Sequence, residues 1–225
     1  MLSTIITYGS MFFFYSLFFL SITIGHKKGS RQLKDVLSGK GEPGTLIVRL
    51  AAGIFFLGLG GAILFVKRNV DGGIIKPDWD KFDLIVCFLI ILAVIAGTLS
   101  ALKQLSATHI FNVFLPFSLS LSFLLIRTFF LIVYEFFFRC VVLFIMIEYV
   151  GLVAAVIANL ILYAVVHWFD KKERYGSVLM GIVLCGVSIY YHSVWPAIFI
   201  HLLLALSNEI ALLVNNNSRI KKLLL

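Results

Sequence analysis

The stretch YEFFFR at residues 134–139 places a glutamate and an arginine inside the long apolar run 110–147. A charged side chain near the centre of a bilayer costs roughly 2.5–3.5 kcal/mol on insertion scales, so ionisable residues at that depth usually have a function and a partner. Glu135 and Arg139 are four residues apart and share one face of a helix, where they can pair. The stretch therefore predicts a membrane helix with a charged pair in its interior.

The composition of the 225-residue chain is that of an integral membrane protein. Hydrophobic residues make up 61% of the chain and charged residues 13%, and the mean hydropathy is +1.05. These values are not those of a soluble domain. The longest polar stretch, residues 26–44, is too short to fold alone. We therefore expect a single integral membrane domain over residues 1–225.

The net charge of +8 reflects lysines and arginines that cluster just outside the apolar runs. Basic residues in such positions contact the anionic headgroups of lipids, so the expected partner is the bilayer and not nucleic acid. We expect a multi-pass protein of the cell (plasma) membrane.

Apolar runs of about 20 residues, the length that crosses ~30 Å of hydrocarbon, predict an all-α polytopic transmembrane bundle of about eight helices. Clear spans are expected at residues 5–24, 45–66, 82–102, 151–169, 176–191 and 194–213. The run 110–147 is nearly twice as long as one span, and Arg127 with Thr128 is expected to divide it into two helices. Eight crossings would put both termini on one side, and the distribution of lysine and arginine favours the cytoplasm.

Two histidines in later apolar runs are candidates for chemistry together with Glu135. His167 ends one run, and His201 lies in the last, with Asn208 two turns further along the same stripe. A carboxyl group in low dielectric can act as a base, and imidazoles can bind a metal or stabilise an oxyanion, so the set suits activation of water for amide hydrolysis. His167 and His201 are the candidate ligands of a divalent metal such as zinc, although catalytic zinc usually takes three protein ligands.

Each of these residues also has a structural interpretation. Glu135 and Arg139 can simply neutralise one another, and His167 can be an interfacial residue at a helix end. Asn208 and Glu209 can be capping or headgroup contacts. A small transporter that uses Glu135 as a proton relay is a further possibility, but it explains none of the order of the motifs.

Three motifs carry a resemblance to a known family: YEFFFRC at residues 134–140, YAVVH at 163–167 and HSVWPAIFIH at 192–201. In this order they resemble the CPBP family of CAAX-processing and bacteriocin-processing intramembrane proteases, which includes the type II prenyl-protein endopeptidase. The resemblance covers residues 134–209 and places a family-like core at 128–213. It implies an intramembrane endopeptidase that acts on a membrane-proximal peptide or membrane protein. Its implied catalytic set is Glu135, Arg139, His167 and His201.

Two of the positions that the family assigns to catalysis depart from its pattern. The first motif of the family is Glu-Glu-x-x-x-Arg, whose first glutamate is taken to be the base, and Tyr134 stands at that position. The third motif is His-x-x-x-Asn, and Ala205 stands at the asparagine position. A tyrosine is a poor base near neutral pH, since its reference pKa is about 10.

Glu135 is the expected replacement for the missing base, although it lies roughly 100° around the helix from position 134. Asn208 is a candidate for the missing asparagine, and Glu173 can fold back over the mouth of the cavity. Tyr163 takes the place of the usual phenylalanine before the histidine of the second motif. The alternative to an endopeptidase is a catalytically silent member of the same fold, a scaffold or immunity-type protein that binds a peptide or membrane protein in the cavity.

Overall fold

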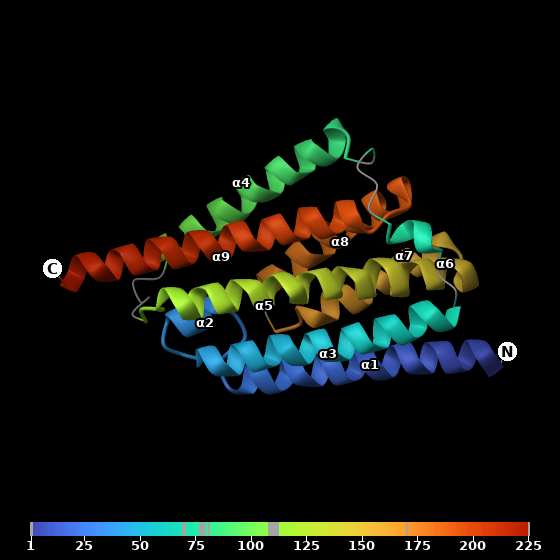
Figure 1. Cartoon of the computed structure of the whole chain (residues 1–225), viewed down its shortest axis with the longest axis horizontal. Helices are drawn as coiled ribbons and strands as arrows, with labels where there is room; N and C mark the ends of the chain where they lie inside the picture. The colour runs from blue at the N-terminus through green and yellow to red at the C-terminus, as the bar shows by residue number, and fades with distance from the viewer. Residues whose placement is uncertain are drawn as a thin grey trace.

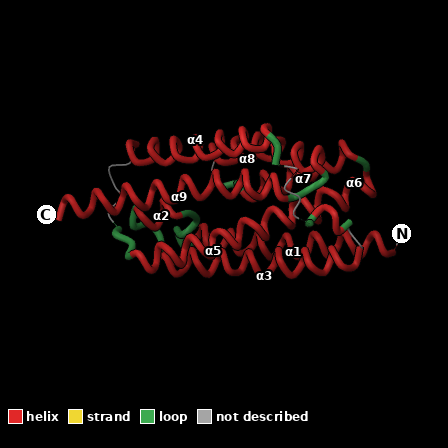
Figure 2. The backbone as a smooth tube through the Cα atoms, turned by 45° about the horizontal axis from the view of Figure 1, so that its top comes forward, coloured by secondary structure: helices red, strands yellow, loops and turns green. Residues whose placement is uncertain are grey.

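The computed structural model describes residues 2–68, 71–76, 80, 82–107, 113–169 and 171–224. Helices dominate these residues and run along one long axis of the molecule (Figure 1, Figure 2). In chain order the elements are α1 (Leu2–Lys27), α2 (Leu33–Leu37), α3 (Pro43–Arg68), η1 (Gly72–Ile74), α4 (Leu84–Ala107), α5 (Phe117–Glu135), η3 (Phe136–Phe144), α6 (Ile145–Val150), α7 (Leu152–Val166), α8 (Lys171–Tyr191) and α9 (Trp195–Leu224). The predicted all-α membrane bundle is confirmed.

The central helix runs without a break from α5 through η3 to α6, so the predicted division of the run 110–147 into two helices is wrong. Arg127 is accommodated inside the bundle because its Nε lies 2.9 Å from Oε1 of Glu209 on α9. The hydroxyl of Thr128 donates to a carbonyl of its own helix. Neither residue removes a backbone donor as proline does, and the helix therefore continues past both.

Six helices are long and apolar enough to cross a membrane in the part of the chain that the structure describes, and α7 is a shorter apolar helix. The spans are Ile6–Lys27, Pro43–Arg68, Leu84–Ser106, Phe117–Val150, Glu173–Tyr191 and Trp195–Ser218. The run 110–147 supplies one of these long helices where two were predicted. The two termini lie at opposite ends of the bundle in Figure 1, so the prediction that they share a side is also wrong. The protein is an integral, multi-pass membrane protein.

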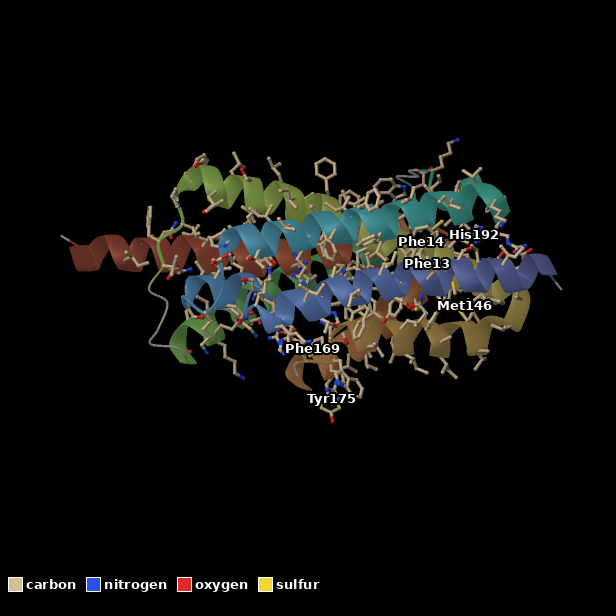
Figure 3. The ribbon with its side chains drawn as sticks, turned by 90° about the horizontal axis from the view of Figure 1, so that it is seen from below. Phe13, Phe14, Met146, Phe169, Tyr175 and His192 are labelled. Carbon is tan, nitrogen blue, oxygen red and sulfur yellow. The ribbon has the colours of Figure 1, made fainter. Side chains whose placement is uncertain are left out.

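The central helix is the core of the bundle, and the other spans surround it. In an apolar 18-residue stretch of the central span, 67% of the residues are buried inside the protein, against 22% to 33% in the corresponding stretches of the other five. Large apolar side chains of the outer helices stay exposed, among them Phe12, Leu84 and Val153. Tyr175 of α8 points away from the bundle in Figure 3. Such an apolar surface on long helices is a surface for contact with the bilayer.

Asparagines of α9 hold the segment that leads into α5. Nδ2 of Asn217 donates to the carbonyl of Leu115 at 2.8 Å, and its Oδ1 accepts from the amide of the same residue at 3.3 Å. Nδ2 of Asn216 donates to the carbonyl of Val113 at 3.0 Å. These side chains satisfy backbone groups that lie before the first turn of α5 and outside its hydrogen-bond ladder.

Asn217→Ala is expected to lower the free energy of unfolding by about 1–2 kcal/mol, because the amide of Leu115 loses its side-chain acceptor and its carbonyl keeps only the longer bond from Oγ of Ser120, at 3.4 Å. Asn215→Ala is the matched control, since the Asn215 side chain is exposed and bonds to the carbonyl of Ala211 in its own helix. Both variants gain the same helix propensity. Unfolding by SDS in mixed micelles, followed by circular dichroism, measures the difference, and equal stability of the two variants would contradict the role of Asn217.

Candidate active site

Glu135, the last residue of α5, is completely buried, and both of its oxygens have partners. Oε2 accepts from Nε of Arg139 at 2.9 Å, and Oε1 lies 2.5 Å from Nδ1 of His201 on α9. The hydroxyl of Tyr163 on α7 lies 3.4 Å from the same Oε1. Three helices thus bring Glu135, Arg139, His201 and Tyr163 to one point.

Arg139 is held by two further residues that the sequence patterns did not single out. Its Nη1 donates to Oδ1 of Asn159 and to Sγ of Cys185 at 3.0 Å. Nδ2 of Asn159 donates to the carbonyl of Phe138 at 2.7 Å. The guanidinium also lies over the ring of Tyr163, 4.6 Å from its centroid. Asn159 could have been noticed as a polar residue inside an apolar run, whereas a cysteine in such a run is usually a small hydrophobe.

The central helix changes its hydrogen-bonding pattern directly after Glu135. The next nine residues of this helix, Phe136–Phe144, form the π-helical segment η3. Such segments are rare and are frequently found at functional sites. Tyr134 and Glu135 both reach His201 in this arrangement, the tyrosine through an edge-on ring contact with centroids 6.0 Å apart. The hydroxyl of Tyr134 is buried and has no hydrogen-bond partner among the described residues.

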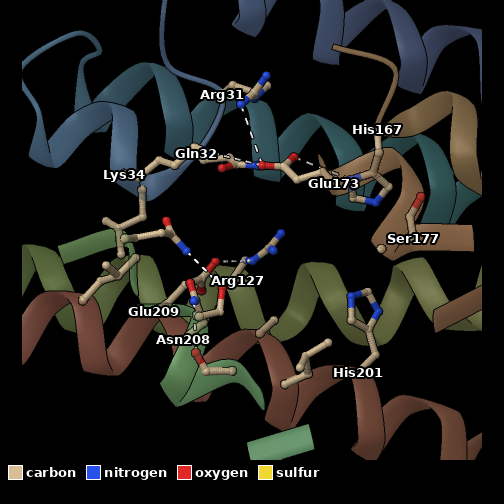
Figure 4. A pocket seen from close by; sticks show the side chains of 18 of the residues that line it. Arg31, Gln32, Lys34, Arg127, His167, Glu173, Ser177, His201, Asn208 and Glu209 are labelled. Carbon is tan, nitrogen blue, oxygen red and sulfur yellow. Dashed lines mark hydrogen bonds and ion pairs between the residues drawn. The ribbon is translucent and has the colours of Figure 1, made fainter. Parts of the chain in front are cut away.

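A cavity of about 640 Å³ lies beside this network, with lining residues from α2, α3, α4, α5, α7, α8 and α9. Tyr163, His167 and His201 line it, whereas Glu135 is fully buried behind them. Figure 4 shows His167 and His201 pointing into the cavity from different elements. A reacting group in the cavity would therefore meet the two histidines before it met the carboxylate of Glu135.

His167 is paired away from Glu135, in the turn that follows α7. Its Nδ1 lies 3.8 Å from Oε2 of Glu173, and Oε1 of Glu173 lies 3.1 Å from Nζ of Lys34. Glu173 lines the cavity. Asn208 also lines it, but its Nδ2 donates to the carbonyl of Gly97 on α4 at 3.1 Å. The side chain of Asn208 thus links α9 to α4. Glu173 lies next to His167.

The site lies within a segment that matches a known family. Residues 116–207 match the family model described as Type II CAAX prenyl endopeptidase Rce1-like. We call residues 116–207 the Rce1-like segment, because they are similar to this family. This confirms the resemblance to the CPBP family, and the family suggests a CAAX-type intramembrane protease. No curated protein and no solved structure matches the chain.

The Rce1-like segment runs from the end of the connector before α5 to the middle of α9. It includes Glu135, Arg139, His167 and His201, together with Asn159 of the buried network. The first four helices lie outside it. The parts of the cavity wall that come from α2, α3 and α4 are therefore not part of the family match.

The Rce1-like segment does not by itself form a zinc site of the usual kind. No group of three or more His, Cys, Asp or Glu side chains is placed to hold a metal ion within the described residues. Nδ1 of His201 is engaged by Glu135, and His167 lies beside Glu173. Catalytic zinc usually takes three protein ligands, so these residues do not fit a zinc centre.

Proposed function

We propose that the protein is an intramembrane endopeptidase in which His201, oriented by Glu135, activates the attacking water. The observation that carries this proposal is the 2.5 Å contact between Nδ1 of His201 and Oε1 of Glu135. An ionised carboxylate only accepts hydrogen bonds, so Nδ1 carries the ring proton in this pair. Nε2 is then unprotonated and can accept a proton from water.

This division of roles differs from the expectation that Glu135 itself is the base. Both oxygens of Glu135 are engaged, and its side chain has no exposed surface. His201 is partly exposed and lines the cavity. Glu135 is therefore a positioning residue in the proposal, and Arg139 holds Glu135 in turn.

The proposed reaction is the hydrolysis of one peptide bond. Nε2 of His201 takes a proton from water while the water oxygen attacks the carbonyl carbon of the substrate. The imidazolium returns the proton to the leaving amine as the C–N bond breaks, and the charge of Glu135 stabilises the imidazolium in between. His167, on another wall of the cavity, is the candidate donor to the developing oxyanion.

The cavity supports a substrate that comes from the membrane. Its apolar wall residues include Leu46, Leu50 and Phe123, and its polar lining residues include the two histidines. A peptide that lies next to the bilayer, or the flanking segment of a membrane protein, matches this mixture.

His201→Ala is expected to lower the turnover of a quenched fluorescent membrane peptide by at least about a hundredfold, since general acid–base catalysis contributes roughly 10²–10⁴-fold. His192→Ala is the matched control, because His192 lies in an exposed connector, 3.1 Å from Asp71. The assay uses purified protein in liposomes, and SDS unfolding confirms that both variants are folded.

The proposal fails if folded His201→Ala protein cleaves the peptide as fast as the wild type. A folded wild type that cleaves no membrane peptide would instead favour the catalytically silent binding protein. Loss of turnover in both histidine variants would also count against a specific role of His201.

A further inference from the structure

Arg49 of α3 is a cation whose Nε is buried and has no hydrogen-bond partner among the described residues. Its attraction to acidic side chains comes from Asp35 and Glu209. Arg49 lies six residues into the membrane span that begins at Pro43, roughly 9 Å along the helix axis at 1.5 Å per residue. A charge at such a position is unfavourable unless it is fully paired, so Arg49 calls for a ligand.

Two further arginines lie around the same space. Arg31, Arg49 and Arg127 come from the connector before α2, from α3 and from α5, and we call them the arginine cluster. They line a second cavity of about 80 Å³ whose wall also includes His167 and His201. Arg127 and Arg31 lie close enough to Arg49 to repel it electrostatically, and this repulsion is stronger than the attraction by the two acidic side chains. Figure 4 shows Arg31 and Arg127 on opposite sides of the pocket.

The acidic residues of the cavity do not neutralise the arginine cluster. Glu209 pairs with Arg127 at 2.9 Å, and Glu173 is shared between Lys34 at 3.1 Å and Arg31 at 3.8 Å. Glu209 attracts Arg49 electrostatically, but its Oε1 is held by Arg127. The larger cavity has five basic and two acidic lining residues: Arg31, Lys34, Arg49, Lys103 and Arg127 against Glu173 and Glu209. A surplus of positive charge therefore surrounds the space.

Gly25 of α1 makes room for the side chain of Arg49. A Cβ at position 25 would lie 2.5 Å from Cδ of Arg49. A helix with glycine at an interior position is less stable than one with alanine by roughly 0.5–1 kcal/mol. A glycine at such a position is therefore expected where a larger side chain would not fit. Here it permits Arg49 to cross the surface of α1.

We propose that the arginine cluster binds a phosphate group, carried by a lipid headgroup or by a soluble phosphate compound. Guanidinium groups donate paired hydrogen bonds to phosphate oxygens. The three positive charges of the cluster match the charge of a phosphate better than the single negative charge of a carboxylate. The adjoining apolar wall can take an acyl chain, which favours the lipid. Binding needs no hydrolysis, so the inference does not rest on the proposed endopeptidase.

Microscale thermophoresis of the full chain in detergent tests the site with four probes: dihexanoyl phosphatidic acid, inorganic phosphate, dihexanoyl phosphatidylcholine and acetate. We expect phosphatidic acid to bind and Arg49→Gln to weaken this binding at least about tenfold, as for loss of a hydrogen bond to a charged group. Lys67→Gln, an exposed cation at the other end of α3, should leave it unchanged. Binding of phosphate without the lipid would assign the site to a soluble phosphate compound.

Gly25→Ala tests the same site with every charge retained. It is expected to displace Arg49 and to weaken binding of the bound phosphate probe. Gly9→Ala on the same helix is its control, because a Cβ at position 9 meets nothing within 4 Å. The proposal is overturned if neither phosphate probe binds, if acetate binds as tightly as phosphate, or if folded Arg49→Gln and Gly25→Ala proteins both bind like the wild type.

Discussion

Arg139→Leu is expected to destabilise the protein by about 3–5 kcal/mol, because it leaves the carboxylate of Glu135 buried without its arginine. Both side chains have no exposed surface, and their 2.9 Å contact is one of several charged contacts in the network. The surrounding bilayer provides no water that could replace the guanidinium. SDS unfolding in mixed micelles, followed by circular dichroism, measures the loss.

The double variant Glu135→Leu with Arg139→Leu distinguishes the effect of the buried charge on stability from the effect of the lost contacts. Replacing a whole buried ion pair by apolar residues is often neutral, so the double variant should recover at least half of the stability that Arg139→Leu loses. Arg127→Leu is the comparison in a more accessible pair, whose side chains are 21% and 12% exposed. It should lose less than Arg139→Leu. If the double variant is as unstable as Arg139→Leu, the carboxylate left without its arginine is not the cause of the lost stability.

The apolar runs were sufficient to predict the helices, because a span of the bilayer needs about 20 apolar residues whatever packs against it. The run 110–147 was misread because one charge in an apolar run is ambiguous. Arg127 looks like the end of a helix until its partner Glu209, 82 residues later, is known. A pairing across two helices depends on how they rotate against each other, and no local pattern encodes that rotation.

The same reason separates the parts of the site that could be predicted from those that could not. Glu135 and Arg139 are linked by the spacing of one helix, and their pairing follows from the sequence. The contact of Glu135 with His201 depends on the packing of α5 against α9, next to the π-helical segment η3. His167 points to Glu173 because α7 ends at Val166 and the chain turns there.

Gly97→Val is expected to destabilise the protein by about 3 kcal/mol, at the upper end of the usual effect of overpacking. A Cβ at position 97 would lie 2.1 Å from Oγ of Ser207 and 2.3 Å from the carbonyl oxygen of Leu204, both on α9. A side chain can move aside, but the carbonyl of a continuous helix cannot. The added side chain must therefore push α4 away from α9 and break the bond from Asn208 to the carbonyl of Gly97.

Two further variants test whether the loss of stability comes from the close approach of α4 to α9 at position 97. Gly186→Val on α8 should keep its stability, because a Cβ there meets nothing within 4 Å. Adding Ser207→Ala to Gly97→Val should not restore stability, since the carbonyl of Leu204 still blocks the valine. Recovery in that double variant would place the conflict on the serine alone, and α4 would then rest on α9 through contacts that tolerate a larger side chain at position 97. SDS unfolding of the four proteins distinguishes these outcomes.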